Sequence, residues 1–318
     1  MIRLNSSDED LNRAAELLAR GKLVALPTET VYGLAADASN ADAVGRIFAA
    51  KGRPADHPLI VHLPGTEALE EWADSPPESA RRLARAFWPG PLTLIVRKAT
   101  RVSDVVTGGQ ETVGLRVPGH PVALKLLKIF GRALAAPSAN RFGRISPTTA
   151  EHVLDEFADQ DTVAAVIDGG PCEVGVESTI VDCSGAQPRI LRPGMISLEQ
   201  LSQVLGEVPT RAGESEGPRA SGRLPSHYAP ATRVELVEAP SLARPDPQAA
   251  VLALAHTPDP GGFMGWRALP VEPAAYARGL YAALRSLDAL GANRILIQRP
   301  PDEPAWVAIH DRLARAAA

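Results

Sequence analysis

The chain has 318 residues, which is too long for one ordinary domain and favours two. Hydrophobic residues make up 45% and charged residues 22% of it, a balance typical of a soluble globular protein. The net charge of −4 excludes a global basic field for nucleic acid, although a local basic patch stays open.

Neither membrane insertion nor secretion is indicated. No stretch approaches the ~18 consecutive apolar residues of a membrane span, and the polar start of the chain lacks the apolar core of a signal peptide. The two cysteines, Cys172 and Cys183, are too few for a disulfide scaffold. We therefore expect a cytoplasmic protein with two buried free thiols and no membrane contact.

The hydrophobic pattern predicts mixed helices and strands over the first two thirds of the chain. Helices are expected at residues 8–19, 41–50, 78–88, 121–130 and 148–157. Strands are expected at residues 23–26, 59–63, 92–96, 113–117, 134–136, 163–167, 178–181 and 189–191. Because the two kinds of element do not alternate strictly, the pattern indicates an α/β fold with a partly antiparallel sheet.

Residues 206–232 change character, with Gly, Ser and Pro and little periodicity, and are predicted to be a linker. The pattern then restarts, with strands expected at residues 234–237, 250–255 and 295–297 and helices at 274–290 and 306–317. We therefore expect a first domain over residues 1–205, a linker over 206–232 and a smaller α/β domain over 233–318.

Two polar clusters about 85 residues apart carry the strongest chemical signal. Lys51 and Arg53 are two cations one residue apart, while Ser138 and Asn140 place a hydroxyl and a carboxamide after an apolar run. Such groups suit a polyphosphate, because Arg makes forked contacts to phosphate oxygens and Lys acts as a point charge. The alternative is local: cations at a helix end, and Ser and Asn in a turn. No P-loop motif occurs in the chain.

Polar side chains also lie on or directly after predicted strands. Residues 27–34 bring hydroxyls, a carboxylate and a phenol to a strand end, where loops of α/β sheets commonly bind ligands. Alternation places Thr112 and Arg116 on one strand face, where Arg116 could hold a carboxylate or be a surface charge. His62 lies in an apolar strand, and a single histidine there is more often a core residue than a catalyst.

Four further signals are weak when each is taken alone. Ser146 precedes a proline in the manner of a helix N-cap, and Ser178 and Arg192 lie at strand ends. Tyr228 lies in the predicted linker, where an aromatic side chain has little structural purpose. It suggests that the linker docks onto another part of the protein.

Taken together, these strings resemble the YrdC-like threonylcarbamoyl-AMP synthases in their longer, two-domain form. The resemblance spans nearly the whole chain and depends on the order and number of modest strings. These are residues 27–34, 51–53, 58–59, 115–118, 136–140, 178–179, 191–194 and 227–230, and in the second domain 276–281 and 308–313.

The resemblance implies a reaction and a fold. The family joins L-threonine, bicarbonate or CO2, and ATP into threonylcarbamoyl-AMP and releases pyrophosphate. A separate transferase then modifies the tRNA adenosine beside the anticodon. The implied fold is a twisted open mixed sheet around a deep cavity, a linker that folds over this cavity, and a small Rossmann-like domain. The chain offers no dedicated carboxylate cage for a metal, so Mg²⁺ is expected to arrive with ATP.

The resemblance also implies roles for individual residues. Threonine would be held by Thr30, His62, Arg116, Ala136 and Ser178. ATP would be contacted by Arg53, His57, Thr112, Ser138, Ser146, Arg192 and Tyr228. The catalytic group would be Lys51, Arg53, Ser138 and Asn140. His57 stands where the family usually has Asn, so a contact there can become pH-dependent.

Two other interpretations are weighed against this one. A carbamoyltransferase of the hydrogenase-maturation kind shares the core domain, but it needs paired-cysteine zinc motifs that two cysteines cannot supply. A plain RNA-binding factor is mildly disfavoured, because residues 1–205 hold 21 basic and 25 acidic side chains. Weak RNA binding and direct handover of the product to a transferase stay open.

Overall fold

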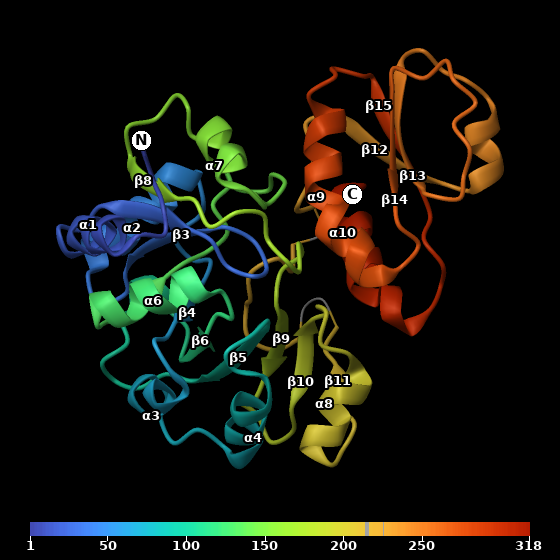
Figure 1. The fold of residues 1–318 in the computed structure, drawn as a ribbon. Coiled ribbons are helices and arrows are strands. Elements are labelled where there is room, and N and C mark those ends of the chain that lie inside the picture. The colour runs from blue at the N-terminus through green and yellow to red at the C-terminus, as the bar shows by residue number, and fades with distance from the viewer. Residues whose placement is uncertain (214–215, 225) are drawn as a thin grey trace.

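The computed structural model describes residues 1–213, 216–224 and 226–318. Figure 1 shows two bodies, each built on its own sheet, with helices α9 and α10 on the side of the smaller sheet that faces the larger body. No helix of the described residues is long and apolar enough to cross a bilayer.

An 11-stranded sheet organises the larger body, in the order β1-β8-β2-β3-β7-β4-β6-β5-β9-β10-β11. It mixes parallel pairs, such as β2 with β8, and antiparallel pairs, such as β2 with β3, as the sequence pattern predicted. Its strands are β1 (Ile2–Leu4), β2 (Leu23–Leu26), β3 (Gly33–Asp37), β4 (Ile60–His62), β5 (Leu92–Arg97), β6 (Thr112–Arg116), β7 (Leu134–Ala135), β8 (Val163–Ile167), β9 (Thr179–Asp182), β10 (Arg189–Arg192) and β11 (Thr210–Arg211).

Helices cover both faces of this sheet, and β2 shows why both must be apolar. Leu23 and Ala25 belong to one buried cluster, whereas Val24 and Leu26 belong to another. Side chains alternate between faces along a strand, so a run of four apolar residues serves both. The helices of this body are α1 (Asp8–Ala19), α2 (Ala41–Lys51), α3 (Leu69–Trp72), α4 (Glu78–Phe87), α5 (Asp104–Thr107), α6 (Pro121–Phe130), α7 (Ala150–Glu156) and α8 (Leu198–Leu205), with a 3-10 turn, η1, at Thr66–Ala68.

The smaller body holds a four-stranded sheet in the order β12-β15-β13-β14, and all its pairs are parallel. This agrees with the expected Rossmann-like α/β arrangement. The strands are β12 (Arg233–Val237), β13 (Ala249–Leu254), β14 (Gly265–Leu269) and β15 (Arg294–Gln298). The helices are α9 (Pro273–Asp288) and α10 (Val307–Ala316), with 3-10 turns η2 (Ala239–Ala243) and η3 (Pro304–Trp306).

Several elements were not predicted. Residues 27–34 were expected to be a polar strand-end loop, but Gly33 and Leu34 begin β3 (Gly33–Asp37), which lies between β2 and β7. The sequence of β3 has no β-branched residue, so the pairing comes from the neighbouring strands rather than from local propensity. Helix α8 and strands β1 and β14 were also missed.

The predicted linker is partly regular. Thr210 and Arg211 form β11, which pairs in parallel with β10 at the edge of the large sheet. Residues 214, 215 and 225 of this segment lie outside the described residues. The rest of the segment runs toward the cavity described below, and a bridge joins Ala229 to Arg144.

Candidate active site

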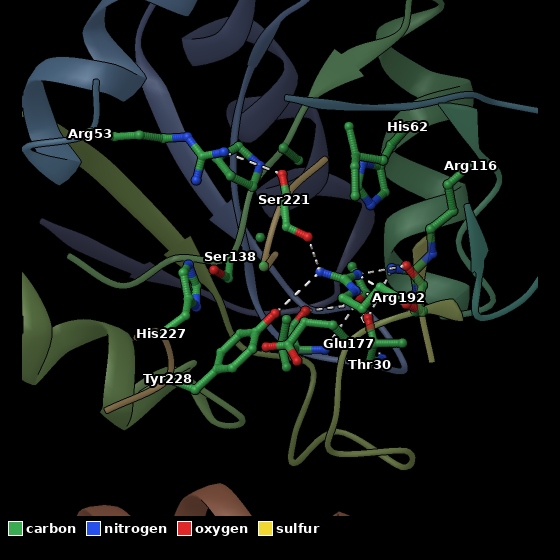
Figure 2. Close-up of a pocket in the computed structure, with 18 residues that line it drawn as sticks. Thr30, Arg53, His62, Arg116, Ser138, Glu177, Arg192, Ser221, His227 and Tyr228 are labelled. Atoms are coloured by element: carbon green, nitrogen blue, oxygen red, sulfur yellow. Dashed lines mark hydrogen bonds between the residues drawn. The ribbon is translucent and has the colours of Figure 1, made fainter. Parts of the chain in front are cut away.

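A buried cavity lies where several strand ends meet the linker (Figure 2). The first body supplies residues that follow β2, β7 and α2, begin β3, lie on β4, end β6 and β10, and precede β9; the linker supplies the rest. The lining residues are Thr28, Thr30, Val31, Gly33, Arg53, Ile60, His62, Arg116, Ala136, Pro137, Ser138, Glu177, Ser178, Arg192, Ser221, Gly222, His227 and Tyr228.

Most of the predicted site residues meet at this cavity. Nine of them line it, namely Thr30, Arg53, His62, Arg116, Ala136, Ser138, Ser178, Arg192 and Tyr228. Five others do not line it, namely Lys51, His57, Thr112, Asn140 and Ser146. Of these five, three support the lining from behind and two lie further away, as the following paragraphs describe.

Three buried arginines converge on the cavity from different elements. Arg116, at the end of β6, forms an ion pair with Glu29 at 2.7 Å and donates to the Thr30 hydroxyl at 2.9 Å. Arg192, at the end of β10, donates to the carbonyl of Ser178 from both Nε and Nη2. The alternative that Arg116 is a surface charge is therefore excluded.

Arg53 is the third of these arginines, and Gly52 sets its direction. Gly52 ends α2 in the left-handed region, with φ of 61°, which a glycine adopts without strain. Arg53 donates to the Pro58 carbonyl at 3.0 Å, and its Nε has no hydrogen-bond partner among the described residues. Burial lowers the pKa of Arg53 to about 10, so the side chain stays charged near neutral pH.

Lys51 supports the cavity wall rather than facing the cavity. Its Nζ donates to the backbone carbonyls of Ser138, at 2.6 Å, and of Asn140. Burial and the nearby Arg53 charge hold the pKa of this amine well below its ordinary value. Asn140 holds the same loop, because its amide donates to the carbonyls of Arg141 and Arg144.

The other predicted residues fall into two groups. Ser146 lies in the next layer and donates to Glu177 at 2.6 Å. His57 is half-buried, with its ring 5.3 Å from that of Phe142, and Thr112 begins β6 at the end opposite Arg116. Burial lowers the pKa of His57.

His62 lies in the cavity wall and is not a satisfied core residue. It is 3% exposed, and its Nδ1 has no hydrogen-bond partner among the described residues. Burial, followed by the Arg116 charge, lowers the pKa of His62 to about 3. The ring is therefore neutral at physiological pH, and it can accept a hydrogen bond from a ligand or donate one to it.

The linker closes the cavity. Tyr228 accepts a hydrogen bond from Arg192 at 3.3 Å, and Ser221 accepts one from Arg53 at 3.3 Å (Figure 2). The remaining space is about 40 Å³, room for about three water molecules at the ~10–15 Å³ that each one needs. The docking of the linker that Tyr228 suggested is therefore observed.

Sequence reasoning missed several lining residues, of which Glu177 matters most. This carboxylate precedes Ser178, and its only sequence signal was that position beside a strand-end hydroxyl. His227 precedes Tyr228 and packs on its ring with the centroids 4.2 Å apart. Ser221 carried no signal, because nothing in a linker sequence says where it docks.

The described residues contain no group of three or more His, Cys, Asp or Glu side chains placed to hold a metal. Cys172 and Cys183 are free and buried, as expected, and burial raises the pKa of both thiols to about 12. Thiols of this kind are inert rather than nucleophilic.

Two family models match the chain. One, described as "Telomere recombination", matches residues 16–194, and the other, described as "Threonylcarbamoyl-AMP synthase, C-terminal domain", matches residues 196–318. A threonylcarbamoyl-AMP synthase from Pyrococcus abyssi is 41% identical over 328 residues, covering 99% of this chain and 96% of that protein. The chain belongs to the threonylcarbamoyl-AMP synthase family.

Two further comparisons extend this result. The crystal structure of P. abyssi Sua5 complexed with L-threonine superposes with a TM-score of 0.90 at 38% identity, covering 99% of this chain and 97% of that one. A threonylcarbamoyl-AMP synthase from Vibrio vulnificus is 37% identical over 156 residues, which are 48% of this chain and 84% of that protein. This chain therefore carries a large part that the shorter protein lacks.

Proposed function

We propose that the protein joins L-threonine, bicarbonate or CO2, and ATP into L-threonylcarbamoyladenylate and releases pyrophosphate. The observation that carries this proposal is the convergence of Arg53, Arg116 and Arg192 on one cavity that six hydroxyl side chains also line. An amino-acid carboxylate and a polyphosphate are both anions that arginine binds with forked hydrogen bonds. The relatives of that name, and the relative complexed with L-threonine, support it.

The proposed chemistry needs no covalent enzyme intermediate. The threonine nitrogen bonds to the carbon of CO2 and loses a proton, which gives a carbamate. A carbamate oxygen then bonds to the α-phosphorus of ATP while the bond to pyrophosphate breaks. The protein contributes positioning and charge stabilisation, which can lower such a barrier by several kcal/mol.

The threonine end of the cavity is assigned to the side near β4 and β6. Thr30, His62, Arg116, Ala136 and Ser178 line it, and Arg116 is held in place by Glu29 and by the Gly90 carbonyl. We assign the threonine carboxylate to Arg116. Neutral His62 would bond to a polar group of the amino acid without adding charge.

The ATP end is assigned to the side covered by the linker. Arg53, Ser138, Arg192 and Tyr228 would contact the nucleotide directly, with His57, Thr112 and Ser146 as outer contacts. Lys51 and Asn140 would hold the Ser138 loop in place from behind, through their hydrogen bonds to its backbone carbonyls. Mg²⁺ would arrive with ATP as part of the MgATP substrate and would offset part of the phosphate charge. Because the closed cavity has room for only a few waters, the linker must move for ATP to enter.

The product would then serve tRNA modification. We expect a tRNA transferase to receive it, either directly or after release, and we expect the reaction to take place in the cytoplasm, where tRNA is modified. Weak RNA binding by this protein stays a prediction, and steep salt dependence of RNA affinity would be its mark.

The test is to incubate the protein with ATP, Mg²⁺ and bicarbonate, with and without L-threonine, and to detect product by mass spectrometry. We expect threonylcarbamoyl-AMP and pyrophosphate only when threonine and bicarbonate are both present. The absence of product from folded, ATP-binding protein would contradict the proposal.

Lys51→Ala tests the catalytic group within the same assay. Removing the buried amine frees the carbonyls of Ser138 and Asn140, so turnover should fall by roughly 100-fold or more while the chain stays folded. Lys128 also lies in the last turn of a helix but is exposed, so Lys128→Ala is the matched control. Near-normal turnover of the Lys51 variant would remove Lys51 from the catalytic group.

A further inference from the structure

Two side chains of the second body reach the wall of the cavity. Tyr281 on α9 donates its hydroxyl to Glu177 Oε2 at 2.9 Å, and Arg312 on α10 donates its Nε to the same oxygen at 2.7 Å. Arg312 is only 1% exposed. Both residues lie in the second-domain strings singled out from the sequence, for which the proposed reaction has no use.

The charge of Glu177 makes these contacts matter. Glu177 lines a cavity that would receive a polyphosphate, and an unpaired carboxylate there would repel it. Burial raises the pKa of Glu177, but the charges of Arg312 and Arg192 outweigh burial and lower it, so the group is ionised. The carboxylate is therefore present as an anion, and Arg312 is the cation in direct contact with it.

The same two residues also hold Tyr228. The Tyr228 ring is stacked on Tyr281 with the centroids 5.9 Å apart, and the Arg312 guanidinium lies 5.2 Å from its centre. The backbone of Tyr228 has φ of 62°, in the left-handed region that a bulky residue adopts only when its surroundings impose it. The surroundings of this ring include Tyr281 and Arg312 of the second body as well as Arg192 of the first.

The linker on either side of Tyr228 is fixed by hydrogen bonds to both bodies. Arg315 on α10 donates to the Leu224 carbonyl at 2.6 Å, and the His227 amide donates to the Arg315 carbonyl at 3.2 Å. The Ala229 amide donates to the Gly143 carbonyl at 2.9 Å. Helix α10 therefore sets where the linker crosses the cavity.

We propose that Arg312 and Tyr281 are positioning residues for ATP: Arg312 neutralises Glu177, Tyr281 donates a hydrogen bond to it, and both hold Tyr228 over the cavity, so the second body completes the nucleotide end of the site. This inference rests on the proposed function. It gives the second body a defined role that a shorter relative, lacking about half of this chain, must meet in another way.

Tyr281→Phe is the sharpest test, because it removes one hydroxyl and keeps the ring stack. Tyr276 lies on the same helix, is equally buried, and its hydroxyl has no hydrogen-bond partner in the described part of the chain, so Tyr276→Phe is the matched control. We expect Tyr281→Phe to raise the KM for ATP about tenfold, the effect of one lost hydrogen bond to a charged group. The KM for threonine should change by less than about twofold. Equal KM values for ATP in the two variants would overturn the proposal.

A rescue experiment separates charge from packing. Arg312→Met leaves Glu177 as an unpaired buried anion, so ATP binding should be lost or the chain destabilised. Adding Glu177→Gln removes that anion, and the double variant should bind ATP more tightly than Arg312→Met alone. If the double variant binds no better, Arg312 does not act through the charge of Glu177.

Hydrogen exchange keeps this proposal distinct from the proposed reaction. In Tyr281→Leu, which removes the ring stacked on Tyr228, the amides of His227 and Ala229 should exchange faster than in the control Tyr276→Leu, whether or not the protein makes any product. Faster exchange without synthesis by the unmodified protein would leave the positioning role and overturn the reaction. Unchanged exchange together with normal synthesis would overturn the positioning role and leave the proposed reaction standing.

Discussion

Burial without a partner is the common condition of the histidines around the cavity. His62 and His227 both line it, and burial is the largest cause that lowers the pKa of each to about 3. Both keep a ring Nδ1 without a hydrogen-bond partner in the described part of the chain. These neutral rings leave the arginines as the cations that face a ligand.

This predicts that acid weakens the folded state. Between pH 6.5 and about 3 the unfolded chain protonates these histidines and the folded chain does not, so the unfolded state binds more protons. The unfolding free energy should therefore fall as the pH drops from 7 to 5. Its slope against pH should correspond to up to about one extra proton bound by the unfolded state for each histidine. Urea unfolding at several pH values measures it, and His62→Asn should remove about one proton from the slope. An unchanged slope, equal to that of the exposed-site control His256→Asn, would contradict the assignment.

At the scale of elements, several of the key site residues lie at or next to the ends of strands and helices rather than in their interiors. Arg53 follows α2, Arg116 and Arg192 end their strands, and Ser178 directly precedes β9. A side chain at the end of a strand or helix is positioned by the rigid core behind it and projects into the cavity. Small changes at these ends should therefore alter binding more than stability.

Gly52→Ala tests this at the end of α2. The left-handed φ of Gly52 costs an alanine about 1 kcal/mol, although nothing lies within 4 Å of an added Cβ. Gly131 ends α6 in the same way, with φ of 69° and equally open space, but the residue that follows it, Arg132, does not line the cavity. Both alanine variants should lose similar unfolding free energy, and only Gly52→Ala should raise the KM for ATP. A matching rise in Gly131→Ala would mean that stability, not the turn, controls binding.

At the scale of the whole molecule, the two bodies share a core. Val31, Ile145, Val176 and Tyr228 of the first body and linker belong to the same buried cluster as the apolar residues of α9, α10 and the smaller sheet. Arg278 on α9 donates to a backbone carbonyl of the loop that carries Glu177. The two bodies are therefore packed against each other and are not joined by the linker alone.

Gly175 packs closely against α9 within this contact. An added Cβ there would lie 2.4 Å from Arg278 Cα, whereas Gly170 has a similar positive φ and nothing within 4 Å. Gly170→Ala should cost about 1 kcal/mol of unfolding free energy, and Gly175→Ala about 2–4 kcal/mol, because overpacking is added to strain. Chemical unfolding measures both, and faster hydrogen exchange in α9 should accompany only Gly175→Ala. Equal losses of unfolding free energy would show that α9 can shift away from an added Cβ at Gly175 at no measurable cost.

Much of the site was predictable because its signals are local. The Lys51–Arg53 and Ser138–Asn140 clusters, and Arg116 and Arg192 at strand ends, can be found from residue type and spacing. Glu177 and Ser221 could not be found in this way. The ion pair of Glu177 with Arg312 and the hydrogen bond of Ser221 with Arg53 each join residues more than 100 positions apart in sequence. Strand β3 was missed for a related reason, since its neighbours rather than its own residues make it a strand.

The amino-acid sequence by itself determined the element pattern, the mixed sheet, the polar clusters and the family resemblance, because these depend on periodicity and residue type. Tertiary structure alone decided which groups face the cavity. Lys51 turns to backbone carbonyls while Arg53 lines the wall, and Arg312 from the far end of the chain neutralises Glu177. Burial, charge pairing and direction are properties of neighbours in space, and spacing along the chain does not contain them.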